Sequence, residues 1–593
     1  MQRRALGLAA FATAIFALPW LPVPDFWITQ LNYIGLFSLV ALGLVLLTGV
    51  GGLTSFGQAA FAGIGAYSSA WLCTAFGASP WLGLLAGLLA TATVALLLGC
   101  LTLRMSGHYL PLATIAWSLA LYYTMGNLDA LGKYDGLLGV PAIHLFGISL
   151  HDERRVYGLI WFCALAAALG LTQLLDSRPG RVMRALNVNR GGGVTMPEAM
   201  GASTFRYKVV MFVIAALLAS LSGWLFAHMQ RSVNPSPFGI KFGIEYLFMA
   251  VLGGVGQVWG AFTGAALVKL TEDQLQVWLP KLIGTAGSYE TIVFGVVLVM
   301  VLKFAPDGVW PMVERWLPKR HRARTPGQTA EPLAARSKPA RGEVLLEAKA
   351  VRKAFGGLVA VNDISFTIRA GDIVGLIGPN GAGKSTTFNL ISGVLPMSSG
   401  EVLLRGQRVD GLPAREVARR GMSRTFQHVK LVPDMTVLEN VALGTYLRTK
   451  SGAFAALLRV DRAEERRALH EARLQLQRIG LSEQADELAG NLALGPQRQV
   501  EIARALASDP SLLLLDEPAA GLRHQEKQAL AAVLRQLKAE GLSLLLVEHD
   551  MDFVMNLTDR IVVMEFGTRL IEGTPAEVQA SPAVRAAYLG TER

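Results

Sequence analysis

The chain has 593 residues, of which 52% are hydrophobic and only 17% are charged, and its formal net charge is +11. Its mean hydropathy is +0.40. This composition excludes a disordered chain, and it is too apolar for an ordinary soluble enzyme. Charged side chains make up about 9% of residues 1–310 and about 24% of residues 343–593. The basic excess lies in the first range and in 311–342, where the positive-inside rule expects it, so no nucleic-acid partner is predicted.

Long apolar runs predict about eight membrane-spanning helices in residues 1–310, because about 20 apolar residues are needed to cross the hydrocarbon layer. Arg3 and Arg4 place the N-terminus on the inner side. The basic loop 177–208 lies on the same side after six crossings, so the soluble end of the chain is also predicted to be inside. The candidate spans are 5–23, 31–50, 56–75, 81–103, 108–126, 156–176, 209–229 and 288–305.

Segment 245–270 is apolar but is interrupted by Gly253-Gly254-Val255-Gly256. A single crossing here would reverse the last span, whereas a re-entrant pair of half-helices restores its orientation. Irregular backbone at membrane depth is tolerated where protein or a water-filled cavity surrounds it, which suits a translocation path. The same glycines also permit close helix packing, and the sequence leaves both interpretations open.

A second glycine-rich element runs from Gly49 to Gly65 and contains Gln58. A glutamine that enters an apolar span usually faces the interior of the helix bundle or a pore. It also serves as a packing contact between helices, and the two interpretations are equally weighted.

Residues 311–342 are rich in Pro, Gly, Ser and basic side chains, which predicts a flexible basic linker. Its cluster Lys319-Arg-His-Arg322 is suited to anionic membrane lipid, although a solvated linker explains it more simply.

Residues 343–593 begin a different kind of domain, with a buried strand at 373–377 followed by Gly378-Pro-Asn-Gly-Ala-Gly-Lys-Ser385. The spacing matches a phosphate-binding loop between a strand and a helix. Its glycines turn backbone N–H groups toward phosphate, Lys384 reaches the β- and γ-phosphates, and Ser385 binds Mg²⁺. The predicted nucleotide-binding residues of this loop are Gly378, Pro379, Asn380, Gly381, Ala382, Gly383, Lys384, Ser385 and Thr386.

A second apolar strand, Leu512 to Leu515, ends in Asp516 and Glu517. Asp516 fits a Mg²⁺ ligand, and Glu517 fits the general base that positions water on the γ-phosphate. His549 follows a third apolar strand and is placed to contact the γ-phosphate. Without the other two motifs, it would be interpreted as a surface histidine.

Residues 343–593, which carry these motifs, resemble the ATPase of a branched-chain amino acid importer of the ATP-binding cassette (ABC) family. The resemblance implies that Phe355 stacks on adenine. It also implies that Gln427 senses nucleotide, contacts the permease and joins Ser385 and Asp516 at Mg²⁺. The motifs that carry it are Phe355-Gly-Gly-Leu-Val-Ala-Val, the phosphate loop, Thr425-Phe-Gln427, Val500-Glu-Ile-Ala-Arg504, Glu517-Pro-Ala-Ala-Gly-Leu522, Val547-Glu-His-Asp550, Glu572-Gly-Thr-Pro575 and Ala587-Tyr-Leu-Gly590.

Residues 30–310 resemble the matching permease. Two resemblances to one system favour the loop 177–208 as the element that docks on the ATPase. The motifs are Gly52-Leu-Thr-Ser-Phe-Gly-Gln58, Gly63-Ile-Gly-Ala-Tyr67, Arg178-Pro-Gly-Arg181, Arg184-Ala-Leu186 and Val251-Leu-Gly-Gly-Val-Gly256.

The resemblance implies a polytopic α-helical membrane domain followed by an α/β P-loop ATPase with a helical subdomain. It implies ATP and Mg²⁺ as cofactors. It also implies a second permease, a second ATPase and a periplasmic binding protein in a bacterial inner membrane, with the ATPase in the cytoplasm. The expected domains are 1–310, the linker 311–342 and 343–593.

The signature before residue 497 departs from the family's Leu-Ser-x-Gly-Gln type. Ala493 replaces the serine, Pro496 precedes Gln497, and Arg523 stands where an acidic residue or Asn is usual. Losing the one charge-assisted hydrogen bond of the serine hydroxyl removes about 1.5–3 kcal/mol of the free energy that stabilises the bound phosphate. The substitutions indicate either a weak ATP site completed by this chain or a tolerated variant. The docking loop is also longer and richer in glycine than expected between Leu186 and Glu198.

The sequence therefore predicts ATP-driven import of branched-chain amino acids or similar amphipathic solutes. Urea, amides or aromatic carboxylates are alternative substrates of the same mechanism. An exporter half-transporter is less favoured, because the loops are short, and a membrane-anchored ATPase does not explain the Gly- and Gln-bearing spans.

Overall fold

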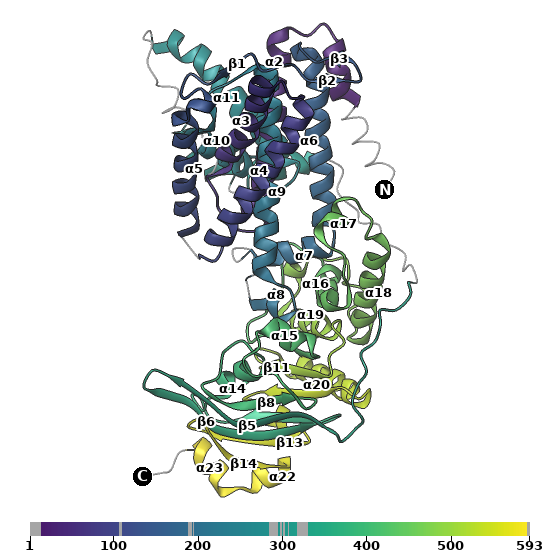
Figure 1. Ribbon diagram of the computed structural model, residues 1–593. Helices are drawn as coiled ribbons and strands as arrows, with labels where there is room; N and C mark the ends of the chain where they lie inside the picture. The colour runs from purple at the N-terminus through teal and green to yellow at the C-terminus, as the bar shows by residue number, and fades with distance from the viewer. Residues whose placement is uncertain are drawn as a thin grey trace. The chain divides into compact units, whose positions relative to one another are not determined.

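A computed structural model describes residues 13–105, 109–187, 193, 195–283, 295–296, 299–300, 303–305, 307–316 and 330–589. The chain forms two compact units (Figure 1). Unit 1 comprises Met1–Asp176 and Phe205–His321, and unit 2 comprises Ser177–Thr204 and Arg322–Arg593. The loop between two of the predicted spans is thus part of unit 2.

Unit 1 is a bundle of apolar helices. Among the described residues, five helices are long and apolar enough to cross a membrane, at Asp25–Val50, Gln58–Phe76, Pro80–Thr102, Glu153–Leu175 and Thr204–Gln230. The first of these is α2 (Asp25–Leu44) continued by the π-helical η2 (Val45–Val50). The other helices of this part are η1 (Leu18–Trp20), α3 (Gln58–Phe76), α4 (Pro80–Thr102), α5 (Tyr109–Asn127), η3 (Asp129–Leu131), α6 (Glu153–Leu175), α9 (Thr204–Gln230), η5 (Ser236–Phe238), α10 (Ile240–Gly253), α11 (Gly260–Ile283) and α13 (Trp310–Trp316).

Five of the predicted spans coincide with these five helices. The span predicted at 108–126 is the helix α5, which is not among the five. The span predicted at 5–23 begins outside the described residues, which start at residue 13, and the span predicted at 288–305 lies largely outside them. Two short antiparallel strand pairs also lie in this unit, with β1 (Leu137–Leu138) pairing with β4 (Ser232–Val233) and β2 (His144–Leu145) forming a hairpin with β3 (Ile148–Ser149).

The predicted interruption within 245–270 lies between α10 and α11. Gly254 and Gly256 have φ values of +141° and +78°, which only glycine adopts readily. The N–H of Val309 donates to the carbonyl of Leu252 at 2.8 Å, so one orphan carbonyl of the α10 end is satisfied. A Cβ at Gly264 would overlap the carbonyl of Met249, so α10 and α11 also pack backbone to backbone. The glycines therefore both interrupt the helix and permit close packing, while their part in a translocation path stays a prediction.

Unit 2 contains two sheets. The six-stranded sheet has the order β10-β11-β12-β7-β13-β14, and all neighbours are parallel except β13 and β14. The antiparallel sheet has the order β6-β5-β8-β9. The strands are β5 (Val344–Phe355), β6 (Leu358–Arg369), β7 (Ile373–Ile377), β8 (Ser399–Leu404), β9 (Gln407–Arg408), β10 (Met422–Arg424), β11 (Leu512–Asp516), β12 (Ser543–Val547), β13 (Arg560–Glu565) and β14 (Thr568–Gly573).

The central strands are buried on both faces, which is why they read as continuous apolar runs. Leu513 and Leu515 of β11 join one apolar cluster with the helices, while Leu512 and Leu514 join another with the antiparallel sheet. The helices of unit 2 are α7 (Arg178–Ala185), α8 (Thr195–Ala199), α14 (Lys384–Ile391), α15 (Ala414–Arg419), α16 (Val437–Leu443), η6 (Gly444–Arg448), α17 (Ala453–Leu457), α18 (Arg462–Arg478), η7 (Ala489–Asn491), α19 (Leu494–Leu506), α20 (His524–Ala539), α21 (Met551–Met555), α22 (Pro575–Ala580) and α23 (Pro582–Leu589). The predicted fold class, a helical membrane domain followed by an α/β ATPase with a helical subdomain, is confirmed.

Residues 330–342, at the end of the predicted linker, are bonded to unit 2. Leu333 is buried, and its carbonyl accepts from Arg448 at 3.0 Å. The backbone N–H of Arg336 donates to Asp509 at 2.5 Å, and Arg405 donates to the carbonyl of Ser337 at 3.0 Å. This part of the segment is therefore attached, whereas 317–329 lies outside the described residues.

The backbone packing of α10 on α11 predicts that Gly264→Ala lowers the midpoint of thermal unfolding in detergent. A methyl group there must push the helices apart, and overpacking of this kind costs about 1–3 kcal/mol. The matched control is Gly158→Ala on α6, where a Cβ meets nothing within 4 Å. That control is expected to unfold at or slightly above the wild-type midpoint, and equal midpoints for the two variants would contradict the prediction.

Candidate functional site

The phosphate loop Gly378–Gly383 joins the buried strand β7 to the helix α14, as predicted. Gly378, Gly381 and Gly383 have positive φ values, and a Cβ at Gly383 would lie 2.5 Å from the carbonyl oxygen of Ala360. The loop therefore requires glycine for both its turn and its close approach to β6. Asn380, Gly381 and Ser385 are exposed, Pro379 and Thr386 are half-buried, and Ala382 is buried.

Lys384 begins α14, and its ammonium is folded over the loop. Its Nζ donates to the carbonyls of Gly378 at 2.7 Å and Pro379 at 2.9 Å. Burial lowers the pKa of Lys384, while the negative charge of Glu517 opposes that shift. The amine and the loop N–H groups thus face the same small volume, which suits a polyphosphate.

Asp516 lies at the end of β11 and is 5% exposed. Its backbone N–H donates to Thr425 Oγ1 at 3.2 Å, and its Oδ2 lies 3.7 Å from the guanidinium of Arg424. Burial raises the pKa of Asp516, and Arg424 opposes that shift. The other carboxylate oxygen, Oδ1, is buried without a hydrogen-bond partner among the described residues. A buried, unpaired acceptor of this kind fits a Mg²⁺ ligand, and the Ser385 hydroxyl on the first turn of α14 fits a second.

Arg424 was not predicted, and it holds Asp516 in place. Its Nη1 donates to Asn389 Oδ1 at 2.9 Å and to Ser392 Oγ at 2.7 Å, and its guanidinium lies over the ring of Phe388. Burial lowers the pKa of Arg424 to about 10, with Asp516 opposing the shift. The sequence offered no signal for it beyond its place two residues before Phe426.

Glu517 and His549 come together at the ends of neighbouring parallel strands. Glu517 has φ +47°, and its N–H donates to the carbonyl of Val547 at 2.9 Å. Its Oε2 lies 3.9 Å from Nδ1 of His549. The positive φ is a strained conformation for a non-glycine residue, and such strain is concentrated at functional sites.

Glu548 is a second residue that the sequence did not single out. Its side chain is buried, with Oε1 accepting from the N–H of Ala519 at 2.6 Å and Oε2 from the N–H of His549 at 3.1 Å. Burial raises the pKa of Glu548, while these two N–H groups oppose the shift. One carboxylate therefore fixes both the turn after Glu517 and the backbone of His549.

Phe355 and Gln427 are exposed, and the structure does not bring them into contact with the phosphate loop. Gln427 lies three residues beyond β10, whose neighbour β11 carries Asp516, so both follow the same edge of the sheet. Phe355 ends β5, and the ammonium of Lys353 lies 5.1 Å from its ring centroid. Both side chains are therefore open to solvent.

The signature helix α19 begins after Ala493, which provides no side-chain cap. Gly495 is buried beside Glu526, since a Cβ there would lie 2.9 Å from Oε1 of that glutamate. The other oxygen of Glu526 accepts from the N–H of Arg523 at 2.8 Å. A carboxylate therefore lies next to the helix terminus where a serine hydroxyl is missing.

The loop 177–204 docks on the helical part of unit 2 through three arginines of α7. In Figure 1, α7 lies beside α16 and α8 beside α15. Arg178 donates to the carbonyls of Tyr446 and Ser451, both at 2.8 Å, and its guanidinium lies over the Tyr446 ring at 3.9 Å. Arg184 lies 3.4 Å from Glu439.

Arg181 is the buried member of the three, with 2% of its side chain exposed. It makes a two-pronged ion pair with Glu465 of α18, whose second contact measures 3.0 Å. Burial alone lowers the pKa of Arg181, but Glu465, Glu439 and Asp461 together raise it above the ordinary value. The guanidinium is therefore charged and locked. The docking helix is short, at residues 178–185.

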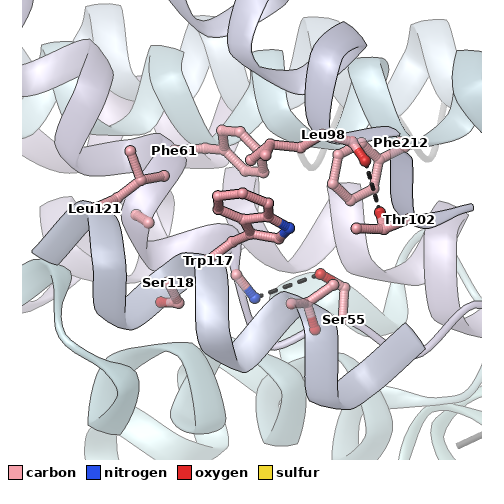
Figure 2. Close-up of a pocket in the computed structure, with 11 residues that line it drawn as sticks. Ser55, Phe61, Leu98, Thr102, Trp117, Ser118, Leu121 and Phe212 are labelled. Atoms are coloured by element: carbon pink, nitrogen blue, oxygen red, sulfur yellow. Dashed lines mark hydrogen bonds between the residues drawn. The ribbon is translucent and has the colours of Figure 1, made fainter. Parts of the chain in front are cut away.

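Two features of unit 1 bear on the predicted translocation path. Gln58, the first residue of α3, is fully buried, and both side-chain amide atoms lack a hydrogen-bond partner among the described residues. A narrow pocket beside α3 is lined by aromatic rings such as Trp117 and Phe212 and by the hydroxyls of Ser55 and Ser118 (Figure 2). Its cavity volume of about 10 Å³ is only what one water needs.

Comparison with known families agrees with this geometry. Residues 26–302 match the permease component of branched-chain amino acid transport systems. Residues 361–520 match the ABC transporter ATPase, and residues 572–593 match the terminal segment of branched-chain amino acid ATP-binding cassette transporters. LivG of Salmonella typhimurium, a high-affinity branched-chain amino acid transport ATP-binding protein, is 45% identical over 249 residues, which are 42% of this chain and 98% of LivG. The chain belongs to the branched-chain amino acid family of ABC transporters.

BraF of Pseudomonas aeruginosa, also described as a high-affinity branched-chain amino acid transport ATP-binding protein, is 41% identical over 42% of this chain and 98% of its own length. The crystal structure of MJ1267 in its ADP conformation, an ATP-binding cassette of an ABC transporter, is 31% identical over 42% of this chain and 99% of that one, with a TM-score of 0.37. The family matches and the relatives of known sequence make the second half of this transporter an ABC ATPase, joined in one chain to a permease.

For this transporter, Glu548→Gln is expected to slow ATP hydrolysis about 10- to 100-fold, because an amide offers one acceptor oxygen where the carboxylate bonds two N–H groups. A hydrogen bond to a buried charged group is worth about 1.5–3 kcal/mol, which converts to this range. Phosphate release by the purified complex measures it. The control Glu577→Gln removes a carboxylate that also accepts a backbone N–H, from Thr574, but lies on α22. Equal rates for the two variants would rule out the proposed role of Glu548.

The docking of α7 predicts that Arg181→Glu abolishes coupled transport, because two carboxylates then face each other in a buried contact. Breaking a buried pair costs about 3–5 kcal/mol. Adding Glu465→Arg in the same chain restores the opposite charges and is expected to recover most of the transport. Uptake per ATP hydrolysed is the readout, and a double variant as inactive as the single one would contradict the pairing.

Proposed function

We propose that the transporter couples ATP hydrolysis in residues 343–593 to import of branched-chain amino acids through residues 1–310. The observation that carries the proposal is the docking of loop 177–204 on the ATPase through the buried Arg181–Glu465 pair. A loop that joins two permease helices and is held on the helical part of the ATPase transmits the motion of one to the other. The permease family match and the relatives' names support branched-chain amino acids as the substrate class.

The ATP site divides its work among the residues described above. The N–H groups of Gly378–Gly383 and the ammonium of Lys384 hold the phosphates, and Phe355 stacks on adenine. Ser385, Gln427 and Asp516 hold Mg²⁺, which when bound neutralises the charge on the β- and γ-phosphates. The placement of Asp516 Oδ1 and Ser385 supports this assignment.

Hydrolysis then requires a positioned water. Glu517 accepts a proton from that water, and its position at the end of β11 is fixed by the bond from its N–H to Val547. His549 contacts the γ-phosphate, and Glu548 keeps the backbone of His549 in place. The charge of Arg424 holds Asp516. Arg424 is itself fixed by two hydrogen bonds, one to Asn389 of α14 and one to Ser392, the residue after that helix.

The complete transporter contains a second ATPase, because the phosphate loop of one ATPase needs the signature helix of another to face it. It also contains a second permease and a periplasmic binding protein. It lies in a bacterial inner membrane with the ATPase in the cytoplasm. This orientation follows from the basic residues of loop 177–208 and from its docking on unit 2.

The proposed function is tested by uptake of labelled leucine into proteoliposomes that contain the complex, its binding protein and internal ATP. Uptake is expected in the wild type and is expected to be absent with Lys384→Ala, which removes the ammonium from the phosphate site. ATP hydrolysis without leucine uptake would overturn the substrate assignment, and thermal shifts of the binding protein with urea, amides and aromatic acids would then identify the solute class.

A further inference from the structure

Unit 1 contains a cluster of charges that the ATP site and the docking loop do not use. Charges are rare in residues 1–310, yet α11 carries Lys269, Glu272 and Asp273 within five positions, and α10 carries Lys241 and Glu245. Ionisable side chains in such a helical bundle are expensive and are by default functional. We call these five residues the charge cluster.

The charges of this cluster interact, and all except Lys241, whose side chain is 67% exposed, are at least partly buried. Lys269 Nζ lies 2.6 Å from Asp273 Oδ1, and only 17% and 13% of the two side chains are exposed. Glu245 is 14% exposed, lies 3.7 Å from Lys241, and interacts electrostatically with Glu272 and Lys269. The second oxygen of Asp273, Oδ2, is buried without a hydrogen-bond partner among the described residues.

An aromatic wall lies directly beside the charge cluster. The ammonium of Lys269 lies 5.4 Å from the ring centroid of Tyr33 on α2. Tyr33 in turn contacts Phe37, at 5.8 Å between centroids, and Phe226 of α9, at 6.5 Å. Phe37 contacts Tyr246, which neighbours Glu245 on α10, at 5.5 Å. Both signs of charge and an apolar surface thus meet where α2, α9, α10 and α11 converge.

Structural stabilisation does not account for this arrangement. A buried ion pair is often no better for stability than apolar residues of the same volume. The cluster also carries three carboxylates against two ammonium groups, so it holds one negative charge in excess. An α-amino acid carries no net charge, but its ammonium can pair with the carboxylate in excess while its carboxylate pairs with a lysine, so it offers one group to each sign.

We propose that the charge cluster and its aromatic wall form a binding site for a zwitterionic, apolar α-amino acid on its way through the permease. The α-ammonium binds Glu245 and the unpaired oxygen of Asp273, and the α-carboxylate binds Lys269, whose ammonium has three donors. The aliphatic side chain lies against Tyr33 and Phe37. The site rests on the proposed function, and it assigns the substrate's charged groups to named residues.

The test uses the leucine-uptake assay of the full complex with the double variant Lys269→Gln/Asp273→Asn. Replacing both partners leaves neither Lys269 nor Asp273 as a lone charge of the broken pair, so a purely structural ion pair tolerates the change, whereas a carboxylate-binding lysine does not. Uptake per ATP hydrolysed is expected to fall at least tenfold, with Glu245→Gln showing a similar loss and Glu245→Asp a smaller one. The matched control is Asp129→Asn, a carboxylate of an exposed ion pair with Lys133.

Double-variant complexes with wild-type thermal midpoints and uptake within twofold of wild type would overturn the site. Should the double variant fail to assemble, wild-type complex is photolabelled with a leucine that carries a diazirine in its side chain. Label on peptides of α2, α10 or α11 that unlabelled leucine displaces supports the site, and label confined to other helices overturns it. Absence of Lys384-dependent leucine uptake in the wild type would instead contradict the proposed function.

Discussion

The buried guanidinium of Arg181 is the contact on which the proposed coupling in this transporter depends. It belongs to a loop between two permease helices, yet it is surrounded by ATPase residues and paired with Glu465. A charge with only 2% of its side chain exposed is tolerated because the carboxylate binds it at two points. Arg178 and Arg184 add contacts with the carbonyls of Tyr446 and Ser451 and with Glu439. These contacts attach a helix of eight residues from the permease loop to the ATPase.

The nucleotide site depends on a different constraint, the shared edge of the parallel sheet. β7 and β11 both flank β12, so the phosphate loop, Asp516 and Glu517 leave the sheet on the same side. His549, after β12, joins them there. Glu548 and Arg424 then convert that topology into fixed positions, the first by accepting two backbone N–H groups and the second by holding Asp516. Glu548 and Arg424 thus position the residues proposed to carry out hydrolysis and take no part in it themselves.

Local patterns were enough to predict most of this site. The sequence alone identifies Gly378–Ser385 and the leucine strand before Asp516, because their spacing and burial follow from chain geometry. Glu548 and Arg424 were missed because their roles arise from contacts with Ala519, His549 and Asn389, which are distant in sequence or made by backbone. Phe355 and Gln427 are exposed, so the polypeptide alone gives no contact that defines their roles.

In unit 1, composition located five helices and the break at Gly254. It predicted only a flexible linker over 330–342, where Leu333 and Arg336 are bonded to unit 2.

The fusion of the two parts changes what the docking contact has to accomplish. When permease and ATPase are separate proteins, their interface must hold the complex together as well as transmit motion. Here the loop 177–204 and its ATPase surface belong to one chain, so docking is intramolecular and has an effective concentration set by the connecting segment. For short flexible connections that concentration is on the order of millimolar. The contacts of α7 can therefore be released and remade during each transport cycle without the risk that the ATPase is lost.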